Sequence, residues 1–226
     1  KPTHWPYATL KPLLLRAGEL TPMHKAERRV LVLANPGHGL ENMKVSPAMY
    51  LGMQLLLPKE WAPSHRHTPN AVRMIVEGRG ATTTVNGEKC REDYPMLRCP
   101  WQDARAALVS LAQSQPSLEA VQVTYINPNT GRDVQNNLGY YALMLRPGQT
   151  LRLPARSPSQ VFHVIEGGVN VTAAGSDFSL TEADTCCTPG YESVTLANRS
   201  SSAPAFVFIA DESPLHRKLG VYEVRD

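Results

Sequence analysis

Two histidines separated by a single residue, His65 and His67, are the strongest local signal for chemistry in the sequence. On an extended strand, residues two apart point to the same face, so both imidazoles would enter the same interior. Two imidazoles on one wall of a pocket make half of a metal site, because imidazole suits Fe, Zn, Cu and Ni. The alternative is a pair of surface or core histidines without a metal. The pair therefore indicates a candidate metal centre.

A candidate for substrate binding follows this pair. Arg73 lies six residues after His67, and even spacing along a continuous strand would place both side chains on one face. The turn-forming residues Thr68, Pro69 and Asn70 interrupt that alternation, so the spacing alone is a weak argument. The planar guanidinium group of arginine fits a carboxylate in a two-point hydrogen bond. The alternative is an arginine on the solvent side of its strand.

Two adjacent arginines, Arg28 and Arg29, come directly before an apolar run. Neighbouring residues on an extended strand point to opposite faces, so only one of them can point into a pocket. The residues alone leave three interpretations open: Arg28, Arg29 or neither faces the pocket.

The chain that must position these residues has the pattern of many short strands joined by turns. Its 15 glycines and 19 prolines are spread between short apolar runs, which is typical of tight turns between strands. One early helix is expected, with Thr9 as its N-cap, apolar residues on one face and Gly18 at its end. The strands expected in the first half, which we interpret as a β-meander, are Val30–Ala34, Gln54–Leu57, Ala71–Val76 and Thr82–Val85.

The second half begins with a helical stretch and then returns to the strand pattern. Alanines and leucines in Asp103–Ala112 have helical spacing. The expected strands are Val121–Ile126, Tyr140–Leu145, Val161–Ile165, Val169–Ala173, Ser193–Ala197 and Ala205–Ile209.

A similar sequence pattern occurs in both halves of the chain. A strand ending in Val-Glu-Gly at residues 76–78 and another ending in Ile-Glu-Gly at residues 165–167 lie about 90 residues apart. This spacing suits a duplicated small β-barrel or jelly roll. We therefore expect an all-β protein with three parts. Residues 1–90 would form a short helical segment and a first barrel, residues 91–120 a helical linker, and residues 121–226 a second barrel.

Composition excludes several other classes of protein. Lys and Arg number 23 against 20 Asp and Glu, a net charge of +3, without the concentrated basic surface that nucleic-acid binding needs. No apolar run approaches the roughly 18–20 residues of a membrane span. The four cysteines, Cys90, Cys99 and the adjacent Cys186 and Cys187, are interpreted as buried thiols in a reducing cytosol. We expect neither nucleic acid nor a membrane as a partner.

The segments around the histidine pair resemble a known family. They are similar to the gentisate 1,2-dioxygenases, a set of bicupins that also includes salicylate and 1-hydroxy-2-naphthoate dioxygenases. The resemblance implies two jelly-roll barrels of the cupin type. It is carried by Glu27–Gly37, Gln54, His65–Arg73, Val76–Gly80 and Val85–Glu88, and it resumes at Tyr125–Gly131 and Val164–Gly167.

The resemblance implies a non-heme Fe(II) dioxygenase that opens the ring of gentisate with O2 to give maleylpyruvate. His65 and His67 would bind the iron in the first barrel. The second barrel, without a histidine at residues 184–191, would hold no metal. Salicylate or 1-hydroxy-2-naphthoate are the alternative substrates. A cytoplasmic homo-oligomer, a tetramer, is also implied.

The resemblance further implies roles for three polar residues. Arg73 and Arg28 would hold substrate oxygens, with Arg29 as the alternative to Arg28. Gln54 stands at the pocket-lining glutamine position of the family, where its amide would hold a substrate hydroxyl or an iron-bound oxygen.

The sequence departs from the family at the third iron ligand, which the family takes from a later histidine. No histidine occurs between His67 and His163, and His163 lies in the expected second barrel. Many cupins carry a glutamate ligand where this chain has Ala71. Two explanations compete. Either the native polypeptide has additional residues between Cys90 and Arg91, including the third histidine, or the protein is a metal-free bicupin that only binds its ligand. The abrupt end of the strand pattern at Cys90 favours the first.

Overall fold

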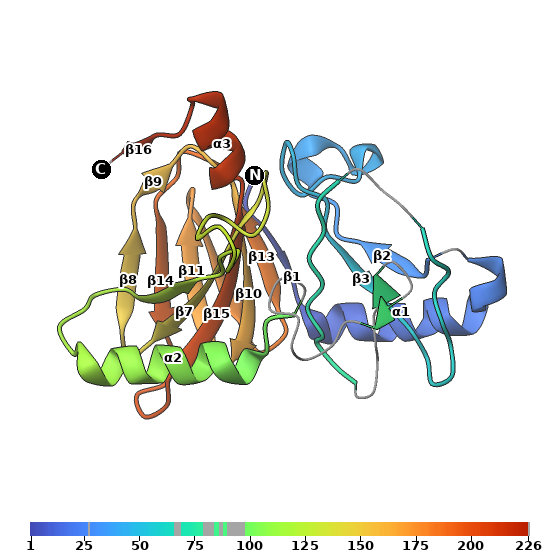
Figure 1. Cartoon of the computed structure of the whole chain (residues 1–226), viewed down its shortest axis with the longest axis horizontal. Coiled ribbons are helices and arrows are strands. Elements are labelled where there is room, and N and C mark those ends of the chain that lie inside the picture. The colour runs from blue at the N-terminus through green and yellow to red at the C-terminus, as the bar shows by residue number, and fades with distance from the viewer. Residues whose placement is uncertain (27, 66–68, 79–83, 86–87, 90–97, 226) are drawn as a thin grey trace.

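Two antiparallel sheets, formed by the C-terminal part of the chain and one N-terminal strand, face each other and form the second barrel (Figure 1). The structure is a computed structural model, and it describes residues 1–26, 28–65, 69–78, 84–85, 88–89 and 98–225. The six-stranded sheet has the order β1 (Thr3–Trp5), β13 (Thr185–Thr188), β10 (Gln160–Glu166), β15 (Ala205–Asp211), β7 (Gly139–Leu145) and β6 (Val121–Thr124). The four-stranded sheet has the order β12 (Ser176–Leu180), β11 (Val169–Ala173), β14 (Val194–Asn198) and β8 (Thr150–Leu153).

Apolar side chains from both sheets fill the interior of this barrel. Along β11, Val169, Val171 and Ala173 are buried while the residues between them are exposed, which is the alternation of a strand with one solvent face. They pack with Phe162 of β10 and Leu143 of β7, which are fully buried. The all-β class predicted from the sequence is confirmed here, and the barrel interior is an apolar core.

A long helix covers the outer face of the six-stranded sheet. Helix α2 (Trp101–Ser114) extends the predicted helix at both ends, and its Leu108 is completely buried against β6 and β7 (Figure 1). The Trp101 ring packs edge-on against Phe206, and its indole N–H donates to Glu166 Oε1 over 2.7 Å. The helix expected as a linker is therefore part of the second barrel's packing.

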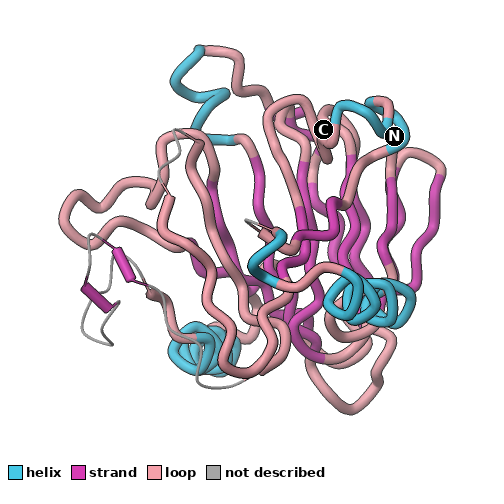
Figure 2. Tube along the Cα trace, turned by 90° about the vertical axis from the view of Figure 1, so that its right-hand side faces the viewer, coloured by secondary structure: helices cyan, strands magenta, loops and turns pink. Residues whose placement is uncertain are grey.

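The N-terminal part contains one helix as long as α2 and several short strands. These are helix α1 (Tyr7–Leu20), the pair β2 (Val30–Val32) with β3 (Gly52–Gln54), and the pair β4 (Thr84–Val85) with β5 (Glu88–Lys89). Figure 2 shows that loops make up most of the rest of this part. At the other end of the chain, helix α3 (Ser213–Leu219) precedes β16 (Val224–Arg225), which pairs with β9 (Ala155–Arg156). Within the described ranges, none of the helices is long and apolar enough to cross a membrane.

Strand β1 links the two parts. It comes from the N-terminal segment yet pairs with β13, with Thr3 opposite Cys187. Cys186 lies in the barrel core, and Cys187 packs on the outer face with Val45 and Met49. Both thiols are free and buried, as the sequence predicted, and they point to opposite faces of their strand. The same prediction was wrong for Cys99, which is exposed because it lies in a loop before α2, and Cys90 lies outside the described residues. The division into residues 1–90, 91–120 and 121–226 stays a prediction, with β1 as an N-terminal strand inside the second barrel's sheet.

The predicted limits of the first helix were wrong at both ends. The helix starts at Tyr7 after Pro6, whose carbonyl accepts from the N–H groups of Thr9 and Leu10 at 3.1 Å. Gly18 lies inside the helix. A Cβ at this position would come within 2.8 Å of Leu55 Cδ2, so the glycine permits close packing and does not end the helix.

Two predicted strands of the first half also differ from the structure. The strand expected at Gln54–Leu57 lies at Gly52–Gln54, where each residue is paired with β2, and only one further backbone hydrogen bond, from Leu55 N to Arg29 O, follows the last pair. Residues 71–76 do not form a strand. A strand needs a hydrogen-bonded neighbour, and no other described strand lies beside these exposed residues. Of the strand expected at Thr82–Val85, Thr84–Val85 forms β4, and Thr82 and Thr83 lie outside the described residues.

Candidate functional site

The β2–β3 pair sorts the adjacent arginines onto two faces. In this pair Val30 lies opposite Gln54, so these two side chains share one face of the ladder. Because side chains alternate along an extended chain, Arg28 belongs to the Val30 and Gln54 face and Arg29 to the other. Gln54 is half-buried there.

Arg28 contacts one of the two candidate metal ligands. Its Nη2 donates to the carbonyl oxygen of Pro63 over 2.5 Å and also to Nδ1 of His65. A guanidinium group can only donate, so Nδ1 of His65 must present its lone pair to Arg28. The structure thus brings together Arg28 and His65, two of the residues that the sequence singled out.

Arg29 is buried and makes contacts that hold neighbouring elements together. It is 3% exposed, and its guanidinium forms an ion pair with Glu60 and donates to the carbonyl oxygens of Gly18, Thr21 and Leu55 at 3.2–3.3 Å. The hydrogen bond from Arg29 is the largest influence on Glu60 and lowers the pKa of that carboxyl. Arg29 therefore joins α1 to the β2–β3 region and is not available to bind a substrate in this arrangement.

Arg73 lies in the exposed segment 69–78. This segment is held at Ala71, whose carbonyl oxygen accepts from Gln135 Nε2 over 2.7 Å, and at Glu77, which forms a 2.7 Å ion pair with Lys11. Among the described residues, Arg73 does not donate a hydrogen bond to Gln54 or His65. His67 lies outside the described residues.

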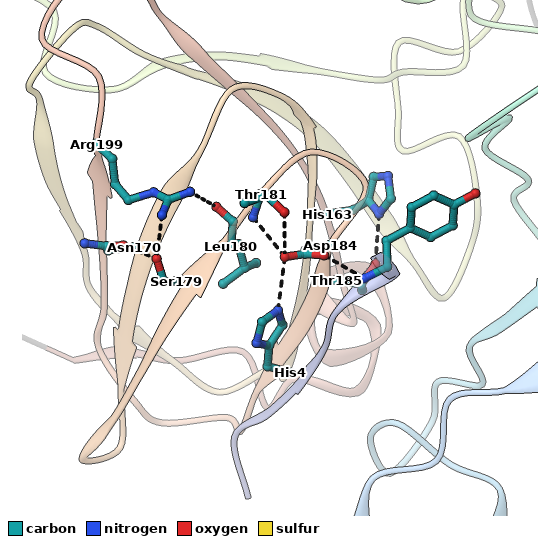
Figure 3. Close-up of polar contacts among 10 residues, drawn as sticks. His4, His163, Asn170, Ser179, Leu180, Thr181, Asp184, Thr185 and Arg199 are labelled. Atoms are coloured by element: carbon teal, nitrogen blue, oxygen red, sulfur yellow. Dashed lines mark hydrogen bonds and ion pairs between the residues drawn. The ribbon is translucent and has the colours of Figure 1, made fainter. Parts of the chain in front are cut away.

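A polar network ties the N-terminal strand to the second barrel (Figure 3). Asp184 accepts from the backbone N–H of Tyr7 over 2.7 Å, from Thr181 N over 2.9 Å and from His4 Nε2 over 3.4 Å. Burial opposes ionisation of this carboxyl, but the hydrogen bonds from Thr181 and Tyr7 outweigh it and hold its pKa below the ordinary value. Each carboxylate oxygen has a donor, so the network is an anchor and offers no open ligand.

His163 belongs to the same region and does not make a metal site with its neighbours. Its Nδ1 lies 2.8 Å from Thr185 Oγ1, and burial lowers its pKa to about 4, against the opposing effect of Asp184. The imidazole is therefore neutral at neutral pH. Among the residues that the structure describes, no three His, Cys, Asp or Glu side chains are grouped as they would be around a metal ion.

Two groups that lie near the candidate residues give no signal in the sequence. The Pro63 carbonyl beside Arg28 is a backbone group, which carries no side-chain signal. Gln135 lies in a loop of the second half, far from Ala71 in the sequence. Only the fold brings these groups to the candidate site.

Comparison with known proteins places this geometry in context. The chain is 54% identical to the gentisate 1,2-dioxygenase of Ralstonia sp over 100% of its own length and 85% of the relative. It is 32% identical to a 1-hydroxy-2-naphthoate 1,2-dioxygenase of Nocardioides sp. (strain KP7) over 70% of this chain and 46% of that protein. The crystal structure of salicylate 1,2-dioxygenase from Pseudoaminobacter salicylatoxidans with gentisate adducts superposes with a TM-score of 0.89. The two sequences are 25% identical, and the match covers 100% of this chain and 84% of the salicylate dioxygenase chain. No family model matches the chain.

The alignment with the Ralstonia protein is longer than the chain itself. It runs over 301 positions, whereas the chain has 226 residues, so at least 75 positions of the alignment hold no residue of this chain. The relative therefore carries internal residues that have no counterpart in this sequence.

Proposed function

The chain belongs to the family of gentisate 1,2-dioxygenases and related ring-cleaving dioxygenases, whose bicupin fold it shares, and we propose that its own reaction opens the gentisate ring with O2 to give maleylpyruvate. The observation that carries this proposal is the 54% identity to the Ralstonia gentisate 1,2-dioxygenase over the whole chain. Salicylate and 1-hydroxy-2-naphthoate are the alternative substrates, because proteins named for them are also relatives. A cytoplasmic homotetramer is part of the same proposal.

The proposed cofactor is a ferrous ion held by His65, His67 and a third histidine. The donor chemistry fits, since imidazole nitrogen suits iron and neutral ligands leave the ion its full charge for an anionic substrate. Bound there, iron would supply the centre at which O2 and the substrate oxygens meet. Of the two ligands in this sequence, the structure describes His65 alone.

The contact between Arg28 and His65 limits how the imidazole could bind a metal. While Nδ1 accepts from Arg28, the proton of the neutral imidazole is on Nε2, so a metal bound at Nε2 would require that proton to move to Nδ1. A histidine that ligates through Nε2 normally carries its proton on Nδ1 and donates it to an oxygen. A protonated Nδ1 cannot also accept from Arg28. We infer that the metal-bound His65 and the Arg28–His65 hydrogen bond exclude each other, and that Arg28 is released toward the substrate.

The proposed substrate contacts follow from the chemistry of gentisate, an aromatic ring with a carboxylate and hydroxyl groups. Arg73 would bind the carboxylate through two parallel N–H···O bonds. Arg28 would hold a second substrate oxygen, and Gln54, on the same face of the β2–β3 pair, would hold a hydroxyl group. Held at several points, the ring would keep one orientation, which raises the fraction of productive encounters.

Turnover of a substrate panel tests the proposed function. We expect the purified full-length protein to consume O2 with gentisate and to yield a ring-opened product. Its kcat/KM for gentisate should be at least about tenfold higher than for salicylate or 1-hydroxy-2-naphthoate. A substrate that lacks a hydroxyl group leaves polar groups of the site unpaired, which weakens its binding in the transition state. A preference for either alternative would reassign the substrate within the family. Absence of both bound iron and turnover would instead support the metal-free binding protein.

The third ligand can be tested by mass. We propose that it lies in residues that the Ralstonia relative has and this sequence lacks, between Cys90 and Arg91, a junction that falls outside the described residues. We therefore expect the intact mass of the protein isolated from its natural source to lie well above the 24.9 kDa of this sequence. A measured mass of 24.9 kDa would contradict the proposal and favour the metal-free alternative.

A further inference from the structure

The segment that carries Arg73 is braced from the second barrel. Gln135 lies in the loop between β6 and β7, and its Nε2 donates to the carbonyl oxygen of Ala71 over 2.7 Å. Ala71 is two residues before Arg73, a distance along the chain of at most about 7 Å. Residues 71–75 are exposed and do not form a strand. A hydrogen bond at Ala71 therefore restricts the backbone from which Arg73 projects.

The orientation of the Gln135 amide is determined by Tyr140. The Tyr140 hydroxyl donates to Gln135 Oε1. Tyr140 is 3% exposed, and burial raises the pKa of its hydroxyl, so this group stays protonated and remains a donor. With Oε1 accepting from Tyr140, the NH2 group of the amide is the part that remains for Ala71. In a flipped amide, the NH2 group would face the donating hydroxyl of Tyr140, and Oε1 would face the carbonyl oxygen of Ala71.

The loop around Gln135 rests on a rigid base. Arg217 of α3 binds Asp133 through two contacts of 2.8 and 2.9 Å, and Lys218 donates to Asn136 Oδ1 over 2.5 Å. The Tyr140 ring stacks on Phe208 of β15, with centroids 5.9 Å apart and an interplanar angle of 18°. Charge-assisted hydrogen bonds and ring stacking both restrict motion. The second barrel therefore presents the Gln135 amide from a fixed position.

We propose that Gln135, oriented by Tyr140, is a positioning residue for Arg73. Through it, the second barrel sets the direction from which Arg73 binds the substrate carboxylate. This inference rests on the proposed function for the role of Arg73, while the brace itself rests on the contacts at Ala71 and Tyr140.

The Gln135→Glu variant tests the brace. The substitution keeps the size of the side chain and an acceptor for Tyr140, but it turns an acceptor toward the Ala71 carbonyl. We expect faster tryptic cleavage after Arg73, because cleavage needs local freedom of the backbone, and a drop of about fivefold or more in kcat/KM for gentisate, as for a lost neutral hydrogen bond. The Tyr140→Phe variant frees the amide to flip and should show a smaller effect of the same kind. The control is Gln113→Glu, which introduces the same charge on the exposed side of α2 and should change neither quantity.

A double-mutant cycle separates positioning from general destabilisation. If Gln135 acts through Arg73, the losses caused by Gln135→Glu and Arg73→Lys will not add, because the second substitution removes what the first misplaces. Additive losses, or kcat/KM unchanged in Gln135→Glu, would overturn the proposal. An unchanged rate of tryptic cleavage after Arg73 would overturn it even if the wild-type protein shows no ring cleavage, since this measurement needs no turnover. Failure of the wild-type protein to cleave gentisate would count against the proposed function alone.

Discussion

The His65→Ala variant is expected to lose its iron and its ring cleavage together, each by more than about 100-fold. Replacing a residue that only hydrogen-bonds to a metal ligand typically costs 10- to 100-fold in metal affinity, so removing a ligand should cost more. His65 is exposed in the structure, and alanine there removes no core volume, so the β-rich circular dichroism should stay unchanged. Metal analysis of the purified protein and O2 uptake with gentisate measure the two effects.

The same result is expected for His67→Ala, because both imidazoles belong to one proposed site. The matched control is His24→Ala, an exposed histidine of the same N-terminal part for which we propose no role. This control should keep its iron and activity. Full iron occupancy and normal turnover in His65→Ala would show that the metal lies elsewhere.

The sequence predicted the second barrel well because its strands have clear apolar patterns. Val169–Ala173 was predicted to the residue, since its buried and exposed residues alternate without interruption. Strands β1, β8, β12 and β13 of its two sheets were missed. Thr185–Thr188 is buried at every position, so no alternation marks it, and β12 has a partly buried polar sequence. Both depend on neighbouring strands that a local pattern does not reveal.

The first half was predicted less well because its elements depend on contacts distant in sequence. The apolar run at residues 71–76 reads locally as a strand, yet it has no described strand beside it. Gly18 reads locally as a helix end, yet it lies against Leu55. At such positions tertiary contacts outweigh local propensity.

The candidate site shows the same division. Alternation along a strand correctly predicted that Arg28 and Arg29 face opposite sides. Arg28 lies on the side of His65, and Arg29 lies on the side of Glu60. Local sequence could not decide between them, because the decision depends on Glu60 and on the end of α1. Gln135 carries no motif, and only the fold brings it to Ala71. Whether these residues bind substrate stays a prediction until variants are measured.

The Arg73→Lys variant is expected to lose about 10- to 150-fold in kcat/KM for gentisate. Lysine keeps the positive charge but lacks the planar fork that binds a carboxylate at two points. A lost hydrogen bond to a charged group costs about 1.5–3 kcal/mol, which corresponds to that range in transition-state stabilisation. Steady-state kinetics measure the loss, and metal analysis should find iron near the wild-type level, because Arg73 is not a proposed ligand.

Two comparisons make this expectation specific to substrate binding. Arg16→Lys changes an exposed arginine of α1 that pairs with Glu19, and it should leave kcat/KM unaffected because that pair is solvent-exposed on both sides. Arg73 is itself exposed and lies outside any described strand, so the substitution should not unfold the protein. An Arg73→Lys protein that unfolds or loses iron would assign Arg73 a structural role. Unchanged kcat/KM on every aromatic acid that the wild type cleaves would remove Arg73 from the site, and the proposed role of Gln135 would then be excluded with it, since Gln135 is proposed to act only through the direction of that guanidinium group.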